Sequence, residues 1–219
     1  MRPLLLALAL LVAMPVAAQV ETLEPVDEAA ADPSFVLFRA RLLEAVAVRD
    51  TAFVLARLDP QATLSFGGAS GVEGFRELWL DEDAVETDLW GTLGSFLPFG
   101  STYDAGPTGS GDEVAARATV PYWFGAWPNG FDAFEHLLVV GESVNVRAAP
   151  STDAPVLTQL SHALVRAESF SEEPWSPIVL ETGETGYVAS RYVRSPIGYR
   201  MGFVHTDGHW RITFFVAGD

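Results

Sequence analysis

The sequence predicts an α+β protein with two folded units, because three patterns follow one another along the chain. Between residues 33 and 97, apolar side chains recur at helical spacing. Between residues 137 and 195, short segments alternate instead, and in Val144–Arg147 the two valines share one strand face. Near the C-terminus, Asp207-Gly208 is a strong two-residue hairpin signal. We therefore expect a helical α+β domain, a small all-β unit and a closing hairpin.

The composition excludes several classes of partner and chemistry. The 219 residues carry 29 acidic side chains against 13 basic ones, all arginine, and the formal net charge is -16. Nucleic acid and anionic membrane surfaces are poor partners for such a chain, since binding them requires basic surface. The absence of cysteine excludes disulfides, thiolate metal sites and cysteine nucleophiles.

The first 18 residues have the pattern of a secretory signal peptide. Arg2 precedes an apolar run over residues 4–13, and Val16-Ala17-Ala18 offers small residues at the cleavage positions. The run is shorter than the roughly 20 apolar residues of a membrane span. We expect cleavage, a periplasmic or secreted product, and no membrane insertion after cleavage. Residues 19–32 are acidic, rich in alanine and without periodicity, which predicts a disordered leader.

Caps and spacing predict the first two helices. Asp32 before Pro33 is an N-cap followed by a proline in the first helical turn. The helix that follows has one apolar face, made of Phe35, Phe38, Leu42 and Val46. Asp50 caps a second short helix that extends to Leu58.

A strand and two further helices are expected next. Residues 63–66 are predicted as a strand with Leu64 and Phe66 facing the core. A helix over residues 71–80 carries Val72, Phe75 and Trp79 on one side. Another helix is predicted over residues 84–97.

The closing hairpin has a register set by its turn. Its apolar cross-strand pairs are His205 with Trp210, Phe203 with Ile212, and Met201 with Phe214. These side chains share one face, which we expect to pack on the N-terminal helices.

The stretch ESVNVRAAPSTDAPVLTQL, residues 142–160, resembles the opening of a bacterial SH3-like (SH3b) domain. A strand ends in V-N-V-R, a turn of small residues and proline follows, and a second strand returns as P-V-x-x-x-L. The resemblance continues through Trp175 and GYVASRYV, residues 186–193. It implies a small barrel over residues 137–195 that serves as a binding module of the bacterial envelope and carries no catalytic chemistry. If the hairpin packs on the helices, this barrel is inserted in an α+β domain made of residues 33–136 and 196–219.

The first domain resembles the nuclear transport factor two-like or SnoaL-like cone fold. The resemblance rests on AVAVRDTAFVLARLDPQATLSFGGASGVEGF, residues 45–75, and on GHWRITFF, residues 208–215. It implies a curved sheet wrapped around helices that enclose a pocket.

Six residues are candidates for ligand contact. In the barrel they are Arg147, Trp175, Tyr187 and Tyr192, and just before it they are Tyr122 and Trp123. An aromatic platform with one arginine suits a peptide that carries carboxylates, because the guanidinium forms bidentate pairs while the rings cover apolar groups. The same aromatic residues also suit a barrel core, and Trp175 and Tyr187 are framework positions of the family that this stretch resembles.

The histidines and acidic residues do not form a recognisable catalytic set. His205 and His209 lie on opposite faces of the predicted hairpin, so they cannot chelate one ion. His136 and His162 stand alone, and the acidic cluster 81–83 lies at a helix boundary, where acidic residues favour capping. We expect no metal, no cofactor and no enzymatic activity.

These observations favour an exported, non-catalytic binding module whose partner is peptidoglycan or an envelope protein or peptide. Two alternatives remain open. The cone-like pocket could serve a small-molecule carrier or enzyme, or the acidic surface could meet a basic envelope hydrolase as its partner or inhibitor. The oligomeric state is left open.

Overall fold

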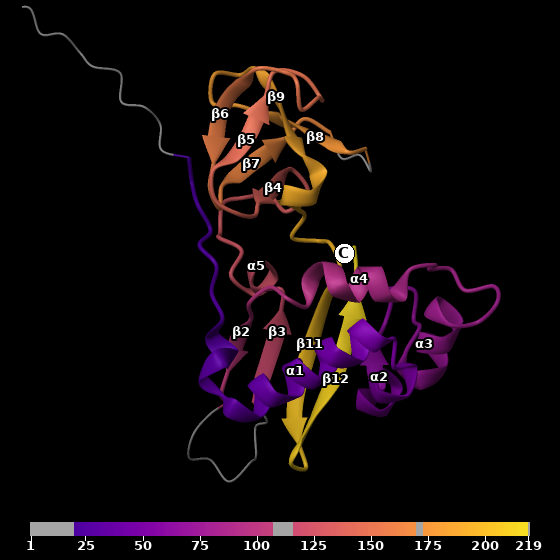
Figure 1. The fold of residues 1–219 in the computed structure, drawn as a ribbon. Helices are drawn as coiled ribbons and strands as arrows, with labels where there is room; N and C mark the ends of the chain where they lie inside the picture. The colour runs from indigo at the N-terminus through magenta and orange to yellow at the C-terminus, as the bar shows by residue number, and fades with distance from the viewer. Residues whose placement is uncertain (1–19, 107–115, 170–172, 219) are drawn as a thin grey trace, which may run out of the picture.

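Two β-sheets organise the protein, and each belongs to a separate unit (Figure 1). The structure, a computed structural model, describes residues 20–106, 116–169 and 173–218. The predicted signal peptide lies outside these residues. Within them, no helix combines the length and the hydropathy needed to cross a membrane.

The first sheet has five strands in the order β1-β12-β11-β3-β2. They are β1 (Leu58–Thr63), β2 (Thr102–Asp104), β3 (Arg117–Val120), β11 (Arg200–Thr206) and β12 (His209–Val216). β1 runs parallel to β12, and the other neighbours are antiparallel. Because β3 and β11 are neighbours in this sheet, the second unit is inserted between them in the chain, which is the arrangement expected from the hairpin.

Four α-helices contribute side chains to the core of the first domain. They are α1 (Pro33–Val48), α2 (Thr51–Arg57), α3 (Gly71–Trp79) and α4 (Leu89–Phe96). The predicted N-caps of the first two are confirmed, since the Asp32 carboxylate accepts from the backbone N–H of Ser34 at 2.8 Å and Asp50 accepts from Phe53 at 2.9 Å.

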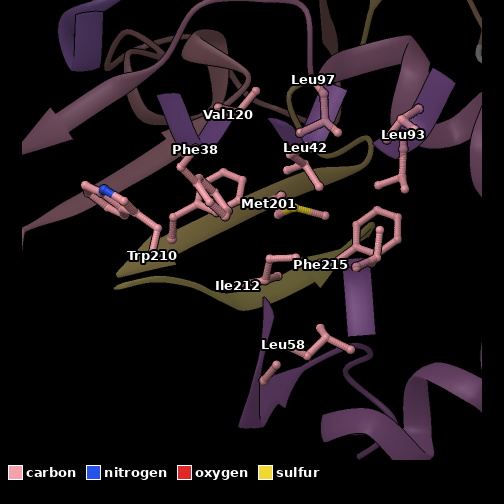
Figure 2. Close-up of a cluster of buried hydrophobic side chains, with 14 of the residues drawn as sticks. Phe38, Leu42, Leu58, Leu93, Leu97, Val120, Met201, Trp210, Ile212 and Phe215 are labelled. Atoms are coloured by element: carbon pink, nitrogen blue, oxygen red, sulfur yellow. The ribbon is translucent and has the colours of Figure 1, made fainter. Parts of the chain in front are cut away.

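The space between these helices and the sheet is filled by side chains (Figure 2). Phe35 of α1 contacts the Phe203 ring edge-on with 5.4 Å between centroids, and the Trp210 ring at 4.8 Å. On the other side of the core, Phe215 stacks on Trp79 of α3 at 5.2 Å. The apolar hairpin face therefore completes the core of the N-terminal helices. The interior that a cone fold would leave as a pocket is occupied here by aromatic rings.

Two elements of the first domain differ from prediction. The strand expected at 63–66 lies earlier, at β1, and Phe66 is 60% exposed although Leu64 is buried. Pro60 obscures β1 in the sequence because proline lacks a strand donor, yet it is tolerated at this sheet edge. The helix predicted over 84–97 begins only at Leu89, capped by the Asp88 carboxylate, which accepts from the Gly91 N–H at 2.9 Å.

The hairpin register is confirmed near the turn and shifts further out. Phe203 pairs with Ile212 as predicted, but a bulge follows, so Gly202 rather than Met201 faces Phe214. Phe215 consequently takes the buried position that was assigned to Phe214.

The second unit is a small, curved sheet of seven strands in the order β10-β4-β7-β8-β9-β5-β6. The strands are β4 (His136–Val139), β5 (Val144–Arg147), β6 (Val156–Leu160), β7 (Leu164–Ala167), β8 (Trp175–Val179), β9 (Thr185–Ala189) and β10 (Val193–Arg194). Val144 and Val146 are both buried in its core, as their alternation predicted.

The predicted disordered leader is wrong for residues 20–32, which we call the N-terminal strap. In Figure 1 this indigo segment runs from the barrel down to α1. Thr22 forms a β-bridge with Ala163 of the barrel, and η1 (Glu28–Ala31) places Ala29 in the core of the first domain. The strap thus contacts both units.

A carboxylate anchors the strap. Asp27 accepts hydrogen bonds from the Arg39 guanidinium, one of them 2.8 Å from Nη1 to Oδ1, and from the Ser101 hydroxyl at 2.6 Å. These bonds, that of Arg39 foremost, hold the pKa of Asp27 below its ordinary value of 3.8 although burial opposes them. Next to Ser101, Gly100 leaves no room for a Cβ beside the Val26 carbonyl. The strap therefore docks on a surface shaped for it.

Truncation at Ser195 should abolish cooperative folding of the first domain. It removes β11 and β12, and with them Phe203, Ile212 and Phe215 from the core. Losing one such side chain costs about 2–5 kcal/mol, so the sum exceeds the roughly 5–15 kcal/mol of a whole domain. Calorimetry measures this, and the unfolding transition of the first domain should be missing from the truncated protein. An unchanged transition would mean that the hairpin is an appendage.

Asp27→Asn should lower the free energy of unfolding by about 2 kcal/mol at pH 7, because hydrogen bonds to a charged group contribute roughly 1.5–3 kcal/mol and this one is partly exposed. The lowered pKa means that the carboxylate stabilises the fold above pH 3.8 and that this contribution is lost as the pH falls through the lowered value. The difference between wild type and variant in urea titrations should therefore shrink below pH 3.8. Asp81→Asn, at an exposed position, is the control. Equal stability of Asp27→Asn and wild type at pH 7 would contradict the anchoring.

Candidate binding groove of the small β domain

A cavity of about 230 Å³ opens on the barrel beside the start of β5 and β8, and we call it the barrel groove. Its wall includes three of the predicted residues, Arg147, Trp175 and Tyr192. The remaining lining residues are Gly141, Glu142, Ser143, Val144, Asn145, Thr152, Ala189 and Arg191. Residues separated by about 50 positions in the sequence therefore meet at one site.

The aromatic wall is held by the contact of β8 with η2 (Ser190–Tyr192). Trp175 pairs with Ala189 across the sheet, and the Ser190 backbone N–H donates to the Pro174 carbonyl at 2.9 Å. The Tyr192 carbonyl accepts from the Val140 N–H at 2.8 Å, which ties η2 to the end of β4. The backbone is thus fixed on both sides, while the Tyr192 side chain remains 37% exposed.

Two guanidinium groups lie at the groove. Arg147 follows a bulge in β5, and its Nη1 donates to the Ala154 carbonyl at 2.7 Å. That bond fixes the side chain and leaves donors of the guanidinium for a ligand, since arginine has five N–H groups. Arg191 lies over the Tyr192 ring, with Cζ 4.8 Å from the centroid. With Glu142 as the acidic lining residue, the wall carries a net positive charge in a strongly acidic protein.

Tyr187 stands apart from the groove wall. It is half-buried on β9, where it pairs with Arg147 on one side and with Pro177 on the other. This position supports the strand that carries Arg147, so its expected ligand contact becomes a packing role.

Tyr122 and Trp123 are wrong as ligand contacts, because each is only 2% exposed. They lie on the short helix α5 (Tyr122–Gly125). Trp123 meets Phe99 edge-on at 4.8 Å. The Tyr122 hydroxyl donates to the Leu23 carbonyl of the strap at 3.3 Å, and burial, helped by the charge of Glu24, raises its pKa to about 12. Both rings fill the interface between the two units.

Sequence reasoning missed Arg191 and Asn145 in the groove. Arg191 had a usable signal, because it stands beside Tyr192 in a segment that must turn between β9 and β10. Asn145 alternates with the buried valines of β5, so its outward direction was predictable but its nearness to Trp175 was not.

A larger hollow of about 710 Å³ lies elsewhere on the barrel, along β6 and β7. Leu157, 44% exposed, and Leu164 contribute apolar surface, and Arg166 and Glu184 contribute charge. Its wall lacks the tryptophan and tyrosine pair of the barrel groove.

The four histidines lie in two regions, with His136 and His162 in the barrel and His205 and His209 near the tip of the hairpin. His205 packs against the Trp210 ring at 5.2 Å, whereas His209 is exposed near the turn. Over residues 20–106, 116–169 and 173–218, no three or more His, Asp or Glu side chains gather as metal ligands would. The expected absence of a metal stays a prediction.

Comparison with known proteins identifies the class of the second unit. Residues 142–194 match the family model of the bacterial SH3 domain. The match extends from the start of β5 to the end of β10, so the chain carries a bacterial SH3 domain, and the barrel groove is part of it. The matched residues lie outside the first domain, and the resemblance of that domain to the cone fold is not confirmed. A search of curated proteins found no match to this chain.

Trp123→Ala should destabilise the protein by about 3–5 kcal/mol, because it removes a large ring from the interface between the units. Urea unfolding followed by far-UV circular dichroism measures the change. Phe134→Ala, at an aromatic residue that is 55% exposed, is the matched control and should cost less than about 1 kcal/mol. Equal effects of the two substitutions would mean that the units are not coupled through α5.

Proposed function

We propose that this protein is an exported, non-catalytic binding protein whose SH3 domain binds a carboxylate-bearing peptide of the cell envelope, with peptidoglycan stem peptides as the ligand. The observation that carries the proposal is the barrel groove, which combines Trp175 and Tyr192 with the guanidinium groups of Arg147 and Arg191. The signal-peptide pattern of residues 1–18 supports export to the compartment where such peptides occur.

The groove supplies two kinds of interaction that a stem peptide needs. Arg147 and Arg191 can hold carboxylates in charge-assisted hydrogen bonds, which are shorter and stronger than neutral ones. The rings of Trp175 and Tyr192 cover apolar side chains and methyl groups. Asn145 adds an amide that can donate to or accept from a peptide backbone. The groove can therefore recognise both the charge of the peptide and the direction of its backbone.

The size of the groove favours modest affinity. Its volume of about 230 Å³ lies below the roughly 300–1,000 Å³ of sites that enclose a whole drug-sized ligand. It therefore fits one end of a peptide. An extended polymer would compensate for this modest affinity, because it presents many stem peptides at a high effective concentration.

The strong acidity of the chain has a consequence for salt dependence. A formal net charge of -16 repels a carboxylate-rich polymer at long range, whereas the two arginines attract it locally. Salt screens the long-range repulsion over a Debye length of about 8–10 Å. Binding should consequently persist at physiological salt.

Tyr192→Ala should reduce retention of the protein on purified peptidoglycan sacculi about fivefold to tenfold, because one aromatic contact is worth about 1 kcal/mol or more. The melting temperature should change little, since this side chain is exposed. Arg191→Gln should act in the same direction. The bound fraction is measured by co-sedimentation.

Arg166→Gln is the matched control, because Arg166 is an exposed arginine of the same domain that lines the hollow along β6 instead. It should leave retention unchanged. Failure of the intact protein to bind sacculi at low and physiological salt would contradict the proposal. Undiminished binding by both groove variants would do so as well.

A further inference from the structure

A second cleft, of about 230 Å³, lies in the first domain at the tip of the β11–β12 hairpin, and we call it the hairpin cleft. In Figure 1 the tip points away from the barrel, so this cleft is separate from the barrel groove. Its wall comes from α1, α2 and the hairpin. The lining residues are Ser34, Leu37, Phe38, Arg41, Phe53, Arg57, His205, Gly208, His209 and Trp210.

The charge of this cleft is opposite to that of the protein. Its lining includes the charged side chains of Arg41 and Arg57 but no acidic residue, although the chain has 29 acidic side chains against 13 arginines. Like charges gathered without a counter-ion repel one another. Such a concentration of basic groups in an acidic protein is what an anion site requires.

The arginines are not used in ion pairs. Over the described part of the chain, the salt bridges are Arg39 with Asp27 and Arg166 with Glu135, so neither Arg41 nor Arg57 takes part in one. The Nε of Arg57 is buried and has no hydrogen-bond partner among the described residues. The other nitrogens of the two guanidinium groups carry N–H donors that an anion in the cleft can use.

The apolar wall of the cleft is held rigidly. The Trp210 indole N–H donates to the Ser34 hydroxyl at 2.9 Å, and Ser34 in turn donates to the Asp32 carboxylate at 2.7 Å. Trp210 also lies near the Phe38 ring, stacked at 6.4 Å. Arg57 is held over the Phe53 ring, with Cζ 5.3 Å from the centroid. Basic and aromatic groups are thus fixed side by side.

We propose that the hairpin cleft binds a small organic anion, namely a carboxylate attached to a flat apolar or aromatic group. Arg41 and Arg57 hold the carboxylate, and the side chains of Leu37 and Phe53 cover the apolar part. Leu37 is 66% exposed, which leaves apolar surface for a ligand to bury. The volume suits a ligand with one ring.

Benzoate is the probe, and benzyl alcohol is its uncharged counterpart of similar shape. In NMR titrations of the full protein, benzoate should shift the Trp210 indole and His209 amide signals with a dissociation constant on the order of 1 mM. Benzyl alcohol should bind at least tenfold more weakly. Equal affinities, or no shift at these two residues up to about 10 mM benzoate, would overturn the proposal.

Two substitutions test the role of the arginines. Arg41→Gln changes an exposed residue, so folding is preserved, and it should weaken benzoate binding about tenfold, as should Arg57→Gln. Arg76→Gln, at an exposed arginine of α3, should leave the affinity unchanged. Unaltered binding by Arg41→Gln, or the same loss in Arg76→Gln, would overturn the assignment. Arg191→Gln should not change the affinity for benzoate, so the result of this experiment is independent of the barrel groove.

Discussion

The antiparallel pairing of β3 with β11 is the constraint on which the rest of this structure depends. Four register pairs, from Met201 with Val120 to Val204 with Arg117, bring together two segments that are separated by the whole SH3 domain. Both connections to the inserted barrel are thereby held at the same end of these two neighbouring strands. The same pairing places β12 beside β1 and delivers Trp210, Ile212 and Phe215 to the core. A domain without this pairing would lack the apolar side chains that β11 and β12 contribute to its core.

Strand β4 connects the two units, because both of its faces are buried. Leu137 and Val139 enter the barrel core, whereas Leu138 faces the interface formed with α5 and the N-terminal strap. The next residue along the chain, Val140, donates its N–H to the Tyr192 carbonyl and so supports the groove. The interface therefore orients the barrel and stabilises the backbone of its binding wall, while the Tyr192 side chain stays accessible to a ligand.

Local signals in the sequence were sufficient for α1, α2 and the hairpin turn, because caps such as Asp32 and Asp50 act within a few residues. Features that arise from distant contacts were not predictable: β1 becomes a strand only by pairing with β12, and the strap is ordered by contacts with Arg39 and Ser101. Of the four barrel residues that the family resemblance suggested, Arg147, Trp175 and Tyr192 line one groove, whereas Tyr187 does not. Their contact with a ligand stays a prediction. The resemblance could not show that the nearby Tyr122 and Trp123 are covered, since an aromatic side chain has the same sequence signature in an interface as in a binding site. The hairpin cleft was missed because its residues come from three separate segments.

The proposed function requires that the SH3 domain recognises envelope peptide through the barrel groove. Chemical-shift mapping by NMR with a soluble muropeptide tests it most directly, since it reports the location of contact residue by residue. The largest amide shifts are expected at Asn145, Arg147 and Arg191, with the Trp175 indole signal moving in parallel. Shifts confined to Leu157 and Leu164, along the larger hollow, would contradict it, as would the absence of any saturable shift.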